Sequence, residues 1–203
     1  MKLFETMRLE AGQIARLQYH YKRIRSASQS LNIPFDSERW QHNLKHVQTQ
    51  YPSGLYRVKL IVHQSGEMQV EVGALGETKK MTAQLIPSKN QVPTWQRIYK
   101  TSERDYLTHD HTTQLALFYD ADGKILEFDI GNVVVVLNGQ SITPNYAHDF
   151  LQGCMRQMLL EQHKITEQYF TVGDLLEMLQ QGGQLWMINS LREWVPISLE
   201  LKN

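Results

Sequence analysis

Apolar residues follow two different spacings along the first third of the chain. From residue 2 to 9 and from 56 to 72 they occupy every second position, which predicts a strand and a hairpin of two strands. From 16 to 31 and from 36 to 51 they recur at steps of three and four, which predicts two amphipathic helices. This part of the chain is therefore expected to fold as a strand, two helices and a hairpin.

The rest of the chain continues the mixture of short strands and helices. The pattern predicts strands at 114–119, 124–128, 132–137, 184–188 and 195–199, and helices at 148–162 and 171–180. Because strands follow one another in hairpins with helices between them, two α+β lobes are expected rather than a doubly wound parallel sheet. The polar, proline-marked stretch 89–94 is the expected linker between a smaller domain (1–88) and a larger one (95–203).

Composition narrows the class of protein. Hydrophobic residues make up 41% of the 203, charged residues 21%, and 21 basic residues balance 21 acidic ones. This composition is typical of a globular domain and gives no indication of binding to nucleic acid or a membrane surface. Cys154 is the one cysteine, so no intrachain disulfide can form. With no long apolar run and no secretion signal, we expect a soluble, cytoplasmic protein.

Two residues have the chemistry to use an aldehyde cofactor. A lysine can form a Schiff base or take up a proton once burial or nearby cations lower its pKa, and Lys100 lies close in sequence to Arg97 and Arg104. Glu127 opens an apolar strand, where a carboxylate can keep a pyridine nitrogen protonated. A surface lysine and an edge-strand glutamate are the plain structural alternatives. Pyridoxal phosphate is the cofactor that needs both an amine and an acid.

Further residues could hold the phosphate of such a cofactor. Gly153, Cys154 and Met155 fall near the start of a predicted helix, where backbone N–H groups and the helix dipole attract anions. Arg23 can bind a phosphate as a planar fork, and Ser190 can donate its hydroxyl from a turn. Packing and turn formation are the alternatives for each.

A metal site is not expected. His109 and His111 are two residues apart, and no third ligand is evident in the sequence.

Six segments occur in an order that resembles a known family. They are LFETMR (3–8), HYKRI (20–24), KT (100–101), Glu127 with Asn132, LQGCMR (151–156) and NSLREWVP (189–196). Together they resemble the class IV aminotransferase family of fold-type IV pyridoxal-phosphate enzymes, most closely its aminodeoxychorismate lyase branch. The resemblance covers nearly the whole chain.

The resemblance implies a two-lobed fold like that of D-amino acid aminotransferase, here with few residues before the first strand. It also implies that Lys100 is the catalytic Schiff-base lysine. The cofactor-binding residues that it implies are Arg23, Lys100, Glu127, Asn132, Gly153, Cys154, Met155 and Ser190. Met155 replaces a threonine that is usual in the family, which removes a hydroxyl donor and leaves the backbone N–H. Glu193-Trp194 stands where a glycine is common, so the pocket is expected to be narrower.

The function implied is that of a 4-amino-4-deoxychorismate lyase, which releases pyruvate and leaves 4-aminobenzoate, a folate precursor. Arg192, then Arg57 and Lys59, are candidates for binding a carboxylate of this small-molecule substrate. A class IV aminotransferase acting on branched-chain or D-amino acids and a non-catalytic descendant of the fold remain alternatives. Family members are usually homodimers, so a homodimer is expected.

Overall fold

The computed structural model describes residues 1–89 and 92–201, and these fall into two compact units. The first unit comprises Met1–Glu77 and Tyr99–Glu103, and the second comprises Thr78–Ile98 and Arg104–Asn203. Each unit is built around its own sheet and its own apolar core.

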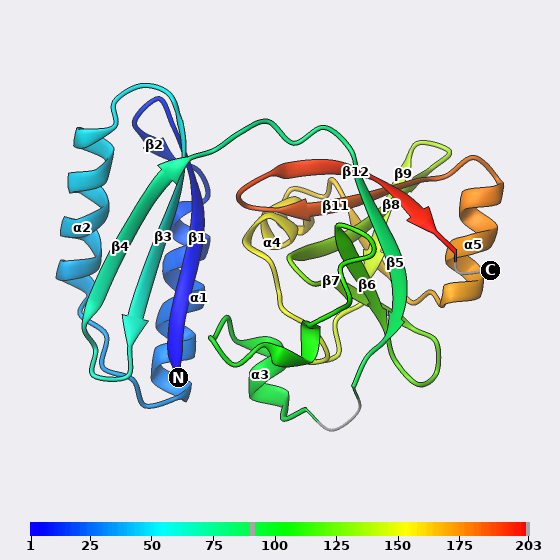
Figure 1. The fold of residues 1–203 in the computed structure, drawn as a ribbon, viewed down its shortest axis with the longest axis horizontal. Helices are drawn as coiled ribbons and strands as arrows, with labels where there is room; N and C mark the ends of the chain where they lie inside the picture. Colours follow the sequence, from blue (N-terminus) through cyan, green and yellow to red (C-terminus); the bar gives the residue numbers. More distant parts are fainter. Residues whose placement is uncertain (90–91, 202–203) are drawn as a thin grey trace. The chain divides into compact units, whose positions relative to one another are not determined.

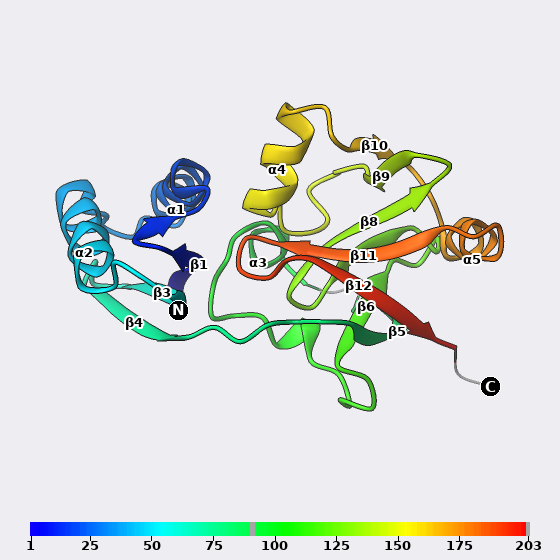
Figure 2. The ribbon, with the colours of Figure 1, turned by 90° about the horizontal axis from the view of Figure 1, so that it is seen from above.

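The first unit is an antiparallel sheet with two helices on one face (Figures 1 and 2). The sheet has the order β2-β1-β3-β4. Its strands are β1 (Lys2–Glu10), β2 (Gln13–Ile14), β3 (Leu55–His63) and β4 (Met68–Ala74), and its helices are α1 (Leu17–Ser30) and α2 (Ser37–Gln50). Alternate apolar residues of the two central strands are buried in a cluster with Ile24, Trp40 and Leu44 of the helices, as predicted: Leu3, Met7 and Leu9 of β1 and Val58, Leu60 and Val62 of β3.

The second unit has eight strands in the order β10-β9-β8-β11-β12-β5-β6-β7, and β7 also pairs with β8. This extra pairing closes the strands from β8 to β7 into a ring. The strands are β5 (Met81–Pro87), β6 (Leu115–Tyr119), β7 (Ile125–Phe128), β8 (Gly131–Leu137), β9 (Gln140–Pro144), β10 (Thr166–Gln168), β11 (Gln184–Asn189) and β12 (Glu193–Glu200). The helices are α3 (Thr94–Ile98), α4 (Cys154–Glu161), α5 (Val172–Gln180) and the 3₁₀ turn η1 (Asp105–Leu107).

Strand β5 was not anticipated from the sequence, and it changes where the units divide. It lies between β12 and β6 and is parallel to both, so its partners are distant in the chain. For this reason Thr78–Ile98 belongs to the second unit, whereas the sequence had suggested a first domain that runs to residue 88. Part of the expected linker, residues 90 and 91, lies outside the described residues.

The sequence had suggested a helix that starts at residue 148, but helix α4 begins at Cys154. The backbone of His148 has φ +58°, which a right-handed helix does not allow. The residues before Cys154 bond instead to side chains of the sheet, since Leu151 N and Gly153 N donate to Glu127 and Asn132. A strong apolar pattern over 148–162 therefore covers both a buried loop and a helix.

No helix in the described part of the chain is long and apolar enough to cross a lipid bilayer.

The capping box of α5 gives a first test of the fold. Asp174 N donates to Thr171 Oγ1 at 3.3 Å, and Thr171 N donates to Asp174 Oδ2 at 2.8 Å. We expect Thr171→Ala to lower the free energy of unfolding by about 1 kcal/mol, because it removes one acceptor at the helix start. Thr171→Ser, which keeps the hydroxyl, should cost less than half as much in denaturant titration. Equal losses in the two variants would mean that the Thr171 hydroxyl does not stabilise the start of the helix.

Candidate cofactor site

Lys100 lies in a short segment that extends the sheet of the first unit. The segment Tyr99–Glu103 runs beside β1, and Phe4 N donates to Lys100 O at 3.1 Å. Leu3 and Thr101 form an antiparallel bridge, and Thr101 is fully buried. These backbone contacts fix the position of Lys100 relative to the first strand of the chain.

The amine of Lys100 contacts the same aromatic ring as a second lysine. Lys100 Nζ lies 4.8 Å from the centre of the Phe4 ring, and Lys59 Nζ lies 5.3 Å from it. Side chains alternate along β1, and the residues on either side of Phe4 belong to the face covered by α1 and α2. Phe4 and the two lysines therefore occupy the opposite face. There Lys59, a predicted substrate residue, contacts the same ring as the predicted catalytic lysine.

Arg23, predicted to bind a phosphate, has a protein partner on the helix-covered face. Its Nε and Nη2 donate to the two carboxylate oxygens of Glu5 at 2.8 and 2.5 Å. His20 Nδ1 lies 2.6 Å from Glu5 Oε2. Glu5 is 1% exposed and His20 is fully buried, so the three side chains form a buried cluster that joins β1 to α1.

The pKa values of this cluster follow from burial and charge. Burial would raise the pKa of Glu5, but Arg23 and His20 together outweigh it and lower this pKa to about 2. Burial lowers the pKa of His20, and this outweighs the opposite effect of the Glu5 carboxylate. The cluster at neutral pH is therefore a charged Glu5–Arg23 pair and a neutral His20 that donates its Nδ1 proton to Glu5.

Glu127 and Asn132, two of the predicted cofactor-binding residues, lie next to each other in the second unit. They are directly opposite each other in the β7–β8 pairing, and both are buried. Glu127 Oε1 accepts from Leu151 N at 3.3 Å. Asn132 donates to Leu151 O at 2.8 Å and accepts from Gly153 N at 3.0 Å. These two side chains thus hold the loop that leads into α4.

Arg104 contacts the same acid. Its Nη2 lies 3.7 Å from Glu127 Oε1, so it faces this carboxylate in the second unit. Burial raises the pKa of the neighbouring Tyr106, and the negative charge of Glu127 adds to the effect. The surroundings of Glu127 therefore include the Arg104 guanidinium and a phenol that stays neutral.

The start of α4 is suited to an anion. Gly153 is the N-cap residue, so the N-cap position itself supplies no side chain to the first N–H groups of the helix. A Cβ at this position would overlap Asn132 Oδ1, which explains why glycine is required. Cys154 and Met155 are both buried, and Met155 packs with Ile188 and the partly buried Trp194. Met155 can therefore offer a backbone N–H to a phosphate, while its side chain belongs to an apolar cluster.

Ser190 lies in a turn whose shape depends on its neighbour. Asn189 Oδ1 accepts from Leu191 N at 3.0 Å and from Arg192 N at 2.7 Å, which closes the turn between β11 and β12. Glu193 follows with φ +62°, a left-handed conformation that glycine adopts without strain. The family's preference for glycine at this position has a direct backbone explanation.

The other two candidate substrate residues are less well placed within their units. The Arg192 guanidinium bonds to the hydroxyl of Thr78. Arg57 is exposed and lies in a different row of the sheet from Lys59, opposite Arg8 and Gly73.

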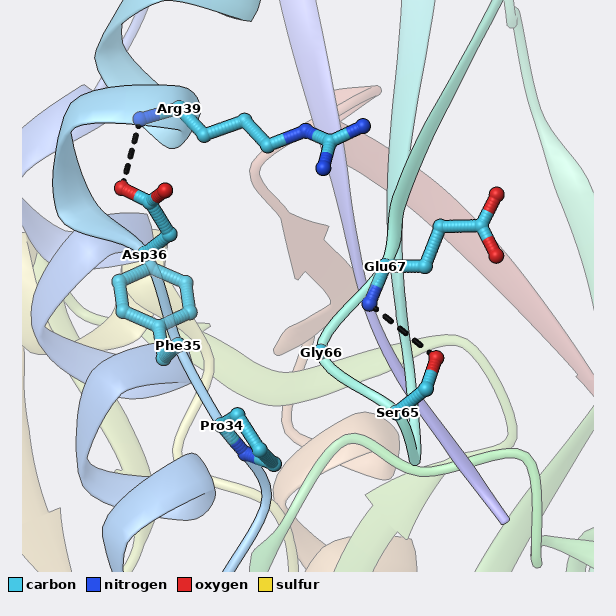
Figure 3. A pocket seen from close by; sticks show the side chains of 7 residues that line it. All are labelled: Pro34, Phe35, Asp36, Arg39, Ser65, Gly66 and Glu67. Carbon is cyan, nitrogen blue, oxygen red and sulfur yellow. Dashed lines mark hydrogen bonds between the residues drawn. The ribbon is translucent and has the colours of Figure 1, made fainter.

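Two other features lie outside the predicted cofactor site. His109 Nε2 lies 3.6 Å from Asp129 Oδ2, and its ring lies 4.2 Å from that of His111. A surface groove of about 460 Å³ lies between the start of α2 and the β3–β4 turn (Figure 3). Its walls are Pro34, Phe35, Asp36, Arg39, Ser65, Gly66 and Glu67, which include no residue of the predicted cofactor site.

The sequence of the whole chain matches one family. A model of amino-transferase class IV matches residues 2–115 and 108–199. The chain belongs to the class IV aminotransferase family.

Individual members of this family are similar over most of their length. A protein of Schizosaccharomyces pombe named "Putative aminodeoxychorismate lyase" is 29% identical over 204 residues, 94% of this chain and 86% of that protein. A crystal structure of a "putative 4-amino-4-deoxychorismate lyase" from Haemophilus somnus 129pt matches with a TM-score of 0.77 and 20% identity, over 95% of this chain and 97% of that one. The PLP-bound form of a hypothetical aminotransferase from Mycobacterium tuberculosis matches with a TM-score of 0.83 and 17% identity, over 98% and 81%. These structural matches confirm the predicted fold-type IV α+β architecture.

The role of Glu5 was not predicted from the sequence. The signal was present, because Glu5 occupies an inward position between Leu3 and Met7 in the alternating strand. An acid at a buried position requires cationic partners, and His20 and Arg23 on one helix face were the available ones.

Removing the guanidinium from the buried cluster should be costly. We expect Arg23→Met to lower the free energy of unfolding by about 3–5 kcal/mol, because Glu5 is left buried without its main cation. In the double variant Glu5→Gln/Arg23→Met a substantial part of the loss should be recovered. Arg25→Met, an exposed change on the same helix, is the control and should cost under about 1 kcal/mol. No recovery in the double variant would refute the charge argument.

Acid should weaken the first unit in two stages. Since the folded pKa of His20 is lowered from 6.5, the unfolded state binds more protons below about pH 6.5, and stability falls with pH. Since that of Glu5 is lowered from 4.5 to about 2, more stability is lost as pH falls below about 4.5. The measurement is the free energy of unfolding by denaturant titration at pH 7.5 and at pH 5.5. The decrease from pH 7.5 to 5.5 should be the same in the wild type and in the exposed control His42→Gln. It should be smaller in His20→Gln.

Proposed function

We propose that the chain is a pyridoxal-phosphate-dependent 4-amino-4-deoxychorismate lyase that produces 4-aminobenzoate and pyruvate. Family membership and the names of the two relatives from S. pombe and H. somnus support this reaction. The observation that carries the proposal is the placement of Lys100. Its backbone is held against β1, while its amine lies on the sheet face that the helices leave open.

The polar groups of the chain fit the three functional parts of the cofactor. An aldehyde requires an amine, which Lys100 supplies. A pyridine nitrogen requires a buried acid, and Glu127 is 4% exposed and held by a backbone N–H. A phosphate requires hydrogen-bond donors, which the backbone at the start of α4 and the Ser190 hydroxyl can provide, whereas the Arg23 guanidinium is paired with Glu5. The chemistry of these donors thus matches the cofactor implied by the family.

When bound, pyridoxal phosphate supplies an electron sink for the charge that develops at the amine-bearing carbon. Lys100 takes the proton from that carbon and later returns a proton as pyruvate leaves. Proton transfer of this kind typically contributes about two to four orders of magnitude in rate. Glu127 would keep the ring nitrogen of the cofactor protonated, and Asn132 holds the loop that leads into α4 through its bonds to Leu151 O and Gly153 N.

The proposal is tested by supplying aminodeoxychorismate to the cofactor-loaded protein. We expect pyruvate and 4-aminobenzoate in equal amounts, and loss of at least two orders of magnitude in rate in Lys100→Ala, because both proton transfers need this amine. Amino transfer to 2-oxoglutarate without pyruvate release would instead support the aminotransferase alternative, which the name of the M. tuberculosis protein favours.

A covalent label gives the control. Borohydride treatment of the loaded protein should attach the cofactor to the peptide that contains Lys100, as read by mass spectrometry. Lys59→Met is the matched variant, because Lys59 contacts the same Phe4 ring. The label should persist in Lys59→Met and disappear in Lys100→Ala. A label on another lysine would contradict the assignment.

A further inference from the structure

Lys59 and Lys100 of the first unit contact the same aromatic ring. It lies in β3, and its ammonium group and that of Lys100 each lie about 5 Å from the centre of the Phe4 ring. The two nitrogen atoms are therefore no more than about 10 Å apart. A molecule that carries an amine at Lys100 and an acid group one ring away would span this distance.

The charge of Lys59 is not used by a neighbouring acid. Its direct neighbours across the sheet are Thr6 on β1 and Glu71 on β4. Among residues 1–89 and 92–201, Lys59 forms no ion pair, and its ammonium group lies over the Phe4 ring. A half-buried ammonium group without a carboxylate, next to an aromatic face, is suited to binding an external anion.

The other candidate cations are less suitable. The Arg192 guanidinium is engaged with Thr78 in the second unit. Arg57 is exposed, whereas Lys59 is half-buried and contacts the ring that Lys100 contacts.

We infer that Lys59 binds a carboxylate of the substrate and so determines which acids react at Lys100. The inference rests on the proposed function, and it refines the earlier ranking, in which Arg192 came first. The proposed products, 4-aminobenzoate and pyruvate, each retain a carboxylate that Lys59 could bind. A charge-assisted hydrogen bond lost at this position should weaken binding by roughly tenfold to a hundredfold.

The experiment measures dissociation constants of 4-aminobenzoate and pyruvate for the cofactor-loaded protein by calorimetry. Lys59→Met should weaken one of the two ligands by about tenfold or more, and Lys59→Arg should restore most of the affinity. The uncharged probe 4-aminobenzamide should bind the wild type and Lys59→Met equally. Lys45→Met, an exposed change on α2, is the control and should leave all three constants unchanged.

Two results separate failure of this inference from failure of the proposed function. If borohydride labels Lys100 in Lys59→Met but both acids bind as in the wild type, Lys59 is not the carboxylate residue. If the wild type itself takes no label at Lys100, the proposed function is refuted and this inference with it. With aminodeoxychorismate, Lys59→Met should raise KM by about tenfold and change kcat by less than threefold.

Discussion

The position of Lys100 in the first unit depends on one interaction, the pairing of the segment Tyr99–Glu103 with β1. The segment is separated from β1 by almost ninety residues, and four strands and three helices of the described chain intervene. The bond from Phe4 N to Lys100 O and the Leu3–Thr101 bridge bring it back to the first strand. Because Phe4 contributes both the backbone donor and the ring, Lys100 and Lys59 meet at one side chain.

The two faces of β1 separate structural from chemical roles. On the helix-covered face Glu5 is neutralised by Arg23 and hydrogen-bonded to His20, which ties the strand to α1. On the other face the neighbouring residue Phe4 contacts the two lysines. A strand in which adjacent residues point in opposite directions can therefore carry a buried ion pair and an open cationic surface at consecutive positions.

In the second unit, the pairing of Glu127 with Asn132 has a comparable organising effect. Two side chains on adjacent strands satisfy the backbone of residues 151–153, and this determines where α4 begins. Gly153 must lack a Cβ because Asn132 Oδ1 occupies that space. The departures from the family pattern leave this arrangement intact, since Met155 packs into an apolar cluster and Glu193 accepts a left-handed backbone at a cost of about 1 kcal/mol.

The sequence alone determined the regular elements with a strong periodic pattern, such as β1, α1, α2 and the β3–β4 hairpin, and the motifs that identify the family. These follow from local spacing, because alternation and three- or four-residue steps reflect the geometry of a strand and a helix directly. Only the tertiary structure decided that β5 belongs to the second sheet, that residues 148–153 form a loop, and that Arg23 is paired with Glu5. It also placed Lys59, and not Arg57, beside the ring that Lys100 contacts. Each of these features depends on a partner far away in the chain. The local pattern of polar and apolar residues does not say which distant group will pair with a buried charge, a strand edge or the backbone of a loop.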